Sequence, residues 1–493
     1  MVKGLYFNFL HLIDNDKNSF IILIASLIVL VTFLFFSGYA SLSELALVSG
    51  DVPSYLLFPF HSLTEAFSSH RTFGFSALLQ GYGILDKDLS SLPLFLIFLY
   101  SLGIVFLYFS LINIKLRPII SLAVCISLML NSSFLTGLET LTAATLVAIS
   151  LLFILGMVFR FNENKVFKHL SILSFLIFIC YQTRPNMATL IILVPIWLAV
   201  IQILFRKNTY EYAFNIFIKS IFINFIPLIL FLLIRFLSVG EIGMNSFSGT
   251  VLSGQSTSYL SSAHIPFLEG ETKKIADGIL ERRNKVSAPC NKAYYDITNE
   301  DRHFCGNIFV MISWLEAIKY HYNLEPFEEV EKNIEPWLHK ELSAFFSINN
   351  LEVDNTLKEY SYTIIRLEPE KAFSRALFEY KFALASLFEL LTQKTFYRLL
   401  ILLFFLSIFL KFIFRLMDKD ITFKPNTYKN DFSFFICLSF IFATYFLQGI
   451  LVSGALLHLD YRYISASLIF LPAIFFTATV LLHSTDTYSE EAK

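Results

Sequence analysis

The chain has 493 residues, of which 56% are hydrophobic and 17% aromatic, while only 16% are charged. Several apolar runs reach the length that crosses about 30 Å of hydrocarbon. This composition excludes an ordinary soluble protein and predicts an all-α polytopic membrane protein. The net charge of -1 gives no sign of a nucleic-acid partner, and we expect none.

The apolar runs predict about ten transmembrane helices. They lie at roughly 20–40, 93–113, 118–135, 140–159, 168–182, 187–205, 214–237, 396–416, 432–452 and 463–482. Basic residues gather in the connections on the side of the N-terminus, whereas the short connections on the other side hold little beyond Arg184 and Arg462. By the positive-inside rule we expect both termini in the cytoplasm.

Three parts follow from this pattern. Residues 1–237 form an N-terminal transmembrane module of about seven spans, and residues 396–493 form a C-terminal module of about three. Within the first module, the outer loop 41–92 contains YLLFPFHSLTEAF and TFGFSALLQGYGIL, whose amphipathic mix predicts interfacial helices lying on the membrane. Residues 238–395 are expected to form a small helical domain outside the membrane.

The outer segment 238–395 changes character along its length. It opens with GMNSFSGTVLSGQSTSYLSSAH, a Gly-rich and Ser-rich stretch that predicts a flexible loop. Beyond it, FVMISWLEAIKYHY, FEEVEKNIEPWLHKELSAFF and the stretch from Leu357 onward alternate apolar and charged residues at helical spacing. We expect the last of these helices to run into the eighth span.

Five cysteines are present. Cys125, Cys180 and Cys437 lie in predicted spans, where a lone thiol acts as a small apolar residue. Cys290 and Cys305 are the pair in the outer segment. A disulfide between them would close about fifteen residues and contribute roughly 3 kcal/mol; two buried free thiols are the alternative.

Asp51 stands in SGDVPSYL, where the chain leaves the first span. A carboxylate at the outer membrane surface can act as a general base that takes the proton of an attacking hydroxyl. The structural alternative is an N-cap, because Pro53 follows at a position suited to the first helical turn. Both roles remain open from these residues alone.

His70 and Arg71 follow in the same outer loop, ahead of the apolar TFGFSALL. A cation at the bilayer surface can neutralise a lipid-linked phosphate. The alternative for Arg71 is an anchor that snorkels to any lipid headgroup.

Three further places hold candidate residues on the outer side. Glu139 lies at the start of the fourth span and either orients a substrate or closes a capping box with Thr136. Arg184, ahead of Pro185, is either an interfacial anchor or a binder of an anionic group. The last outer connection is either a functional loop or part of an aromatic belt, and it contains Asp460, Arg462 and Tyr463.

The order of these features resembles the polytopic C-type glycosyltransferases, the GT-C fold. The matching stretches are SGDVPSY, HRTFGFSALLQ, GLETLTAATLVAISLLF, TRPNMATLIILVPIW and DYRYISASLIFLPAIF. The group includes aminoarabinose and mannosyl transferases and the serotype-converting glucosyltransferases of O-antigen. The resemblance implies that Asp51 is the catalytic base and that Glu139 belongs to the catalytic site.

The same resemblance implies a polyprenyl-phosphate-linked sugar as donor and a glycan or lipid-linked acceptor, such as O-antigen or lipopolysaccharide. His70, Arg71, Arg184, Asp460, Arg462 and Tyr463 are the corresponding residues for the donor phosphate and the substrate. The protein is expected in the bacterial inner membrane, among membrane lipids, with its active site periplasmic.

No cofactor is expected, and the sequence gives no support for a divalent metal, because no zinc motif or phosphate-binding glycine loop is present. Two alternatives are a transporter or flippase for polyprenyl-linked glycans and an O-antigen polymerase or ligase. A transporter would place charges in the central turns of its spans. A ligase would be expected to carry its arginine-rich loops late in the chain.

Overall fold

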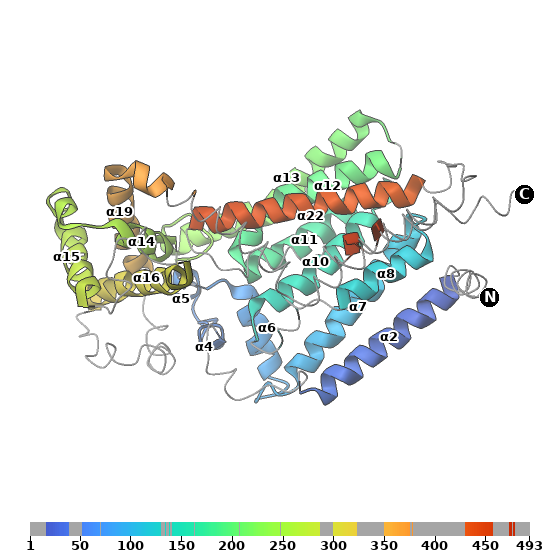
Figure 1. The fold of residues 1–493 in the computed structure, drawn as a ribbon, viewed down its shortest axis with the longest axis horizontal. Helices are drawn as coiled ribbons and strands as arrows, with labels where there is room; N and C mark the ends of the chain where they lie inside the picture. The colour runs from blue at the N-terminus through green and yellow to red at the C-terminus, as the bar shows by residue number, and fades with distance from the viewer. Residues whose placement is uncertain are drawn as a thin grey trace, which may run out of the picture.

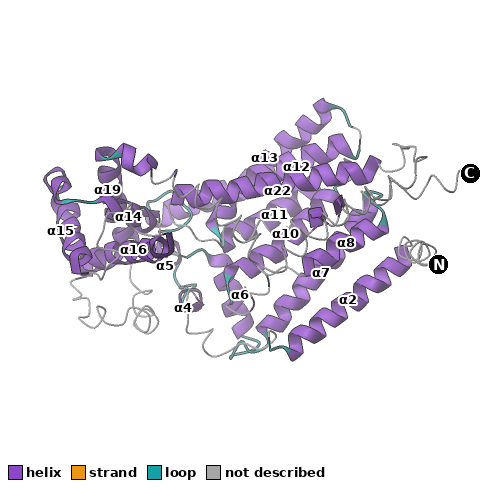
Figure 2. Cartoon of the chain, in the orientation of Figure 1, coloured by secondary structure: helices purple, strands orange, loops and turns teal. Residues whose placement is uncertain are grey.

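The fold is seen in a computed structural model. It describes residues 16–38, 52–69, 71–129, 134, 138, 141–161, 163–206, 208–246, 248–285, 299–322, 350–374, 377, 429–456, 473–475 and 477–478. The predicted span 396–416 and most of 463–482 lie outside these residues. Every regular element in the described part is a helix (Figure 2).

Six described helical segments are long and apolar enough to cross a membrane. They include α2 (Asp16–Phe36), α7 (Leu92–Asn113), α11 (Val166–Thr183), α12 (Leu190–Leu204), α13 (Tyr210–Val239) and α22 (Lys429–Leu456). Two shorter apolar helices, α8 (Pro118–Met129) and α10 (Ala143–Phe159), complete the described bundle. A helical multi-pass membrane protein is thus confirmed, while the count of ten spans stays a prediction.

The bundle has two ends that differ in chemistry (Figure 1). At the far end, where α2 and α22 begin, Arg117 pairs with Asp431 of α22, and Arg206 donates to the carbonyl of Phe161. The opposite end carries a separate group of helices and is called the domain end below. Because the basic connections lie at the far end, the arrangement agrees with the predicted charge asymmetry.

The helical domain contains α14 (Ser248–Tyr259), α15 (Gly270–Lys285), α16 (Asn299–Tyr322) and α19 (Asn350–Leu367). It has a hydrophobic core of its own, in which Ile275, Phe309 and Leu357 are buried. The structure corrects one prediction here: residues 248–259 form a helix packed against α16 and α19, and not a flexible loop. The predicted helix in FEEVEKNIEPWLHKELSAFF lies outside the described residues.

Helix α14 is stabilised by close packing: its small residues allow α16 and α19 to approach its backbone. A Cβ atom at Gly254 would collide with Val310 of α16, and one at Gly249 would collide with the backbone of Asp354 on α19. The Asp354 carboxylate also accepts a hydrogen bond from the Thr250 backbone N–H at 3.0 Å, which satisfies an amide in the first turn. Tertiary packing therefore overrides a local composition that favours a loop.

The outer loop contains α4 (Val52–Leu56), α5 (Leu63–Ser68) and α6 (Phe73–Gly83), so both stretches expected to be helical do contain helices. Helix α6 packs against α4 on one side and α11 on the other. Its contact with the bundle buries Phe75 and Leu79. Whether these helices lie flat on a membrane remains a prediction.

Candidate functional site at the domain end of the bundle

Three of the predicted site residues, Arg71, Arg184 and Cys305, are described. The others lie outside the described residues: Asp51, His70, Glu139, Cys290, Asp460, Arg462 and Tyr463. The site is therefore built from the helices that flank these positions. Both described arginines lie at helix ends on the domain end of the bundle (Figure 1).

Arg71 is held by the short helix that begins at the residue after Asp51. Its Nε donates a hydrogen bond to the Ser54 hydroxyl at 2.8 Å, and its guanidinium carbon lies 4.8 Å from the centre of the Tyr55 ring. A hydrogen bond and a cation–π contact together fix the direction of this charged group. Arg71 is thus a positioned cation and not a freely moving surface side chain.

Helix α4 is tied in turn to α6. The Gln80 amide donates hydrogen bonds to the backbone oxygens of Leu56 and Phe58, at 2.9 Å each. The rings of Tyr55 and Phe75 pack edge to face with centroids 5.1 Å apart. These contacts satisfy carbonyls at the end of α4, which a helix of five residues leaves unpaired.

Close packing of α6 on α11 brings the Arg71 segment to the Arg184 segment. A Cβ atom at Gly74 would lie 2.6 Å from the backbone oxygen of Gln182, so only glycine fits this position without a shift. Nearby, the rings of Phe73 and Phe178 pack with centroids 5.7 Å apart. Gly74 is three residues after Arg71, and Gln182 is two residues before Arg184.

Arg184 occupies the turn that the sequence predicts. Its backbone is extended, with φ −142° and ψ 115°, as expected for a residue that precedes proline. Helix α11 ends there, and the short helix η2 (Pro185–Thr189) begins at Pro185. The Gln448 amide of α22 donates to the Asn186 backbone oxygen at 3.2 Å, so the turn is packed against the last described span.

Several buried polar atoms around this packing have no hydrogen-bond partner in the part of the chain that the structure describes. They are Ser76 Oγ on α6, the Tyr181 hydroxyl, both amide atoms of Gln182 and Asn186 Nδ2. Leaving a buried donor or acceptor unpaired costs about 1–3 kcal/mol. The sequence does not identify these residues as part of a site, because neutral polar residues are common at the end of a span. They stand out only once the structure shows that α6 packs against α11 and that they are buried without partners.

Arg235 is a second feature that the sequence reasoning missed. It lies on α13 with 1% of its side chain exposed, and it donates to the Phe67 backbone oxygen at 3.1 Å and to the Ser246 hydroxyl at 2.8 Å. An arginine inside the predicted span 214–237 is itself a sequence signal for a buried polar contact. Its partners show that it joins α13 to the outer loop.

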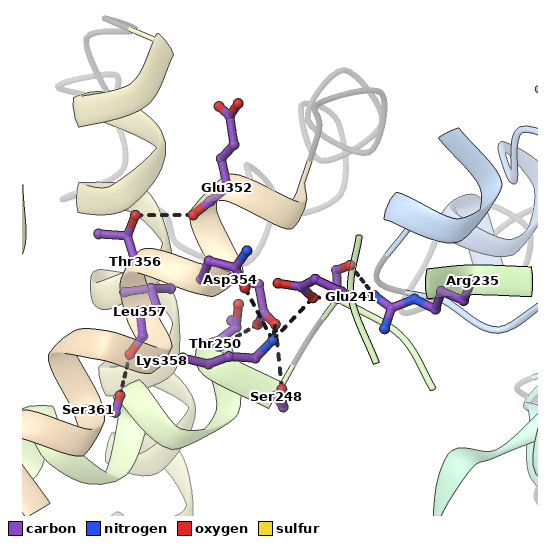
Figure 3. Close-up of polar contacts among 12 residues, drawn as sticks. Arg235, Glu241, Ser248, Thr250, Glu352, Asp354, Thr356, Leu357, Lys358 and Ser361 are labelled. Carbon is purple, nitrogen blue, oxygen red and sulfur yellow. Dashed lines mark hydrogen bonds and ion pairs between the residues drawn. The ribbon is translucent and has the colours of Figure 1, made fainter. Parts of the chain in front are cut away.

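An ionic chain continues from Arg235 into the helical domain (Figure 3). Arg235 lies 3.8 Å from Glu241, Glu241 lies 3.5 Å from Lys358, and Lys358 lies 3.0 Å from Asp354. Burial raises the pKa of Asp354 above its usual value, although Lys358 and the amide of Thr250 oppose this shift. Helix α13 and the helical domain are therefore linked through charged side chains.

The comparisons with known proteins give no family. No protein-family model, curated protein or solved structure matches this chain. The residues and their geometry therefore carry the functional interpretation. No group of side chains suited to a metal ion is found among the described residues.

Cys305 is disulfide-bonded, whereas Cys125, Cys180 and Cys437 are free and buried in the bundle. The expected partner of Cys305, Cys290, lies outside the described residues. Burial places Cys305 in the core of the helical domain, so its bond belongs to the scaffold and not to the candidate site.

Proposed function

We propose that this chain is a membrane glycosyltransferase that moves a sugar from a polyprenyl-phosphate donor to a glycan or lipid-linked acceptor, such as O-antigen or lipopolysaccharide. The reaction would take place on the periplasmic side of a bacterial inner membrane, at the domain end of the bundle. The observation that carries the proposal is the position of Arg71, which is fixed by Ser54 and Tyr55 of α4, the helix that starts directly after Asp51.

The chemistry assigns a role to each charged group. An acceptor hydroxyl attacks the anomeric carbon of the donor sugar, and Asp51 takes the proton from that hydroxyl. The bond between the anomeric carbon and the phosphate oxygen breaks, and the lipid phosphate leaves with the electron pair. Arg71 and Arg184 stabilise the negative charge on this leaving group, with Arg462 as a further candidate from the sequence.

The unpartnered groups beside Arg184 support a polyhydroxylated substrate. Gln182 offers both a donor and an acceptor, while Ser76 and Tyr181 offer hydroxyls. Sugar hydroxyls are both donors and acceptors, so they complement such a neutral set. Because these atoms are buried, binding would require a local movement that exposes them to the substrate.

A transporter or flippase is the first alternative, and an O-antigen polymerase or ligase is the second. In the described spans, Asp, Glu, Lys and Arg side chains stay near the helix ends, except for Lys219 on α13. A transport path would require charges in the central turns of several spans. This distribution favours chemistry at the membrane surface.

The test is transfer in proteoliposomes that contain the full chain, radiolabelled polyprenyl-phosphate sugars and lipopolysaccharide as acceptor. Wild-type protein should transfer label, and Asp51→Asn should abolish transfer without loss of folded protein. Asp88→Asn, which changes an exposed carboxylate of the same loop, is the matched control and should stay active. Wild-type turnover by Asp51→Asn would overturn the assignment of the base.

A further inference from the structure

Helices α2 and α7 meet at one end and separate toward the other. Near the far end of the bundle, the hydroxyls of Ser19 and Tyr108 are hydrogen-bonded, and the rings of Phe20 and Phe109 lie 5.1 Å apart. Toward the domain end, the two helices line an open groove with a volume of about 660 Å³. That volume lies within the range of about 300–1,000 Å³ that is typical of small-molecule sites.

The wall of this groove, the α2–α7 groove, is almost wholly apolar. Its lining includes Ile28, Val31, Leu94, Phe98, Leu102 and Val105. Ile28 and Phe98 are 61% and 57% exposed, although both lie within membrane spans. Because the groove belongs to two spanning helices, the hydrocarbon of the bilayer is the medium that reaches it.

The length of the groove fits a chain from one leaflet. From Ser91 to Val105 the groove follows α7 for fourteen residues, or about 21 Å at 1.5 Å per residue. Half of a hydrocarbon core is about 15 Å thick. The groove therefore runs from headgroup level past the bilayer centre, and the Ser19 and Tyr108 contact lies beyond it, toward the far end of the two helices.

The domain end of the groove is polar and negatively charged. The Tyr82 hydroxyl is hydrogen-bonded to Ser91, and the Asp86 carboxylate accepts from the Ser91 hydroxyl at 2.6 Å and from the Ser91 N–H at 2.8 Å. These bonds lower the pKa of Asp86 and keep it ionised. With Asp88 and Lys87, the segment 86–88 carries two acids and one base, a net charge of -1.

We propose that the α2–α7 groove binds one hydrocarbon chain of a zwitterionic phospholipid, whose headgroup ammonium lies at the carboxylate of Asp86. The charge at the groove entrance favours an ammonium group over an anionic headgroup. This site is separate from the sugar-transfer site, and the inference does not depend on the proposed function.

The test uses the full chain in nanodiscs with trace phosphatidylethanolamine or phosphatidylglycerol that carries a photoreactive diazirine on one acyl chain. After illumination, mass spectrometry maps the labelled residues. Label from phosphatidylethanolamine should concentrate on Val31, Leu94 and Phe98, and should exceed label from phosphatidylglycerol by about fivefold, the effect expected for one exposed charge pair. Asp86→Asn, which keeps the shape of the side chain, should remove that preference.

Two variants that fill the groove, Ser101→Phe and Leu102→Trp, should lose the label on α2 and α7. Ile229→Trp changes an exposed apolar residue on α13 outside the groove and should leave the label unchanged. Label spread evenly over exposed faces of α2, α7 and α13 would overturn the proposal. Equal labelling by the two lipids, or an unlabelled groove in the wild-type chain, would overturn it as well.

Discussion

The Nε of Arg235 donates a hydrogen bond to the backbone oxygen of Phe67, 3.1 Å away, and this bond ties a membrane span to the outer loop. Arg235 lies twenty-five residues after Tyr210, or about 38 Å along α13. Val239, where the helix ends, lies four residues after Arg235. Helix α5 is held by this bond, by the packing of Phe67 on Phe231 and by the hydrogen bond from the Ser246 N–H to the Ser69 backbone oxygen.

Replacing Arg235 should destabilise the protein. Arg235→Gln leaves the Phe67 carbonyl and the Ser246 hydroxyl short of donors in a buried place, at about 1–3 kcal/mol for each group. We expect a clear fall in the thermal unfolding temperature in nanodiscs. Lys219→Gln, an exposed change on the same helix, should have almost no effect; equal falls for the two variants would show that Arg235 has no special role.

Gly74 and Gly81 provide a matched pair on α6. Gly74→Ala places a Cβ atom 2.6 Å from the Gln182 backbone oxygen, whereas nothing lies within 4 Å of a Cβ atom at Gly81. Gly74→Ala should cost about 1–3 kcal/mol through overpacking, while Gly81→Ala should be neutral or stabilising by up to about 1 kcal/mol. Denaturant unfolding of both variants measures the difference. A stable Gly74→Ala protein would mean that α6 moves freely on α11.

Ser54 should act on catalysis through Arg71. Ser54→Ala removes the partner of Arg71 Nε, and the loss of a hydrogen bond to a charged group should raise the KM for the lipid-linked donor about tenfold, with a smaller change in kcat. Arg71→Lys keeps the charge but loses the planar group, so it should be impaired as well. Proteoliposome kinetics with varied donor give both parameters.

Ser62→Ala is the control for Ser54→Ala, because Ser62 caps α5 in the same loop and its hydroxyl accepts from the Glu65 N–H. It should leave the KM for the donor unchanged. A KM for Ser54→Ala equal to that of wild type would contradict the positioning role of Ser54.

Asp354 should make stability depend on pH. Burial raises its pKa in the folded state, so its contribution to stability is complete below the pKa of the unfolded chain, about 4, and is lost as pH rises through the folded value. Asp354→Asn cannot ionise and should flatten the pH profile of the unfolding temperature above about pH 4. Asp277→Asn, at an exposed carboxylate of α15, should keep the wild-type profile; the same slope in Asp354→Asn would rule out Asp354 as its source.

The spans could be predicted because membrane helices are apolar along their whole length, which a sequence displays directly. The turn at Arg184 could be predicted because Pro185 restricts the residue before it. By contrast, the sequence could not predict that Gln182 and Ser76 belong to the candidate site. Their burial without partners follows from the contact of α6 with α11, which depends on the three-dimensional fold. Helix α14 was assigned wrongly, since its glycines and serines are typical of loops unless close neighbours surround them.

Helix α14 also has a consequence for the order in which the chain folds. Its sequence, SGTVLSGQSTSY, is a poor helix former, and a twelve-residue helix is marginal in isolation. Its stabilising partners arrive much later in synthesis: Val310 about sixty residues on, and Asp354 about one hundred. Helix α14 therefore lacks its stabilising neighbours until α19 has been synthesised, and only then can the helical domain assemble as a unit.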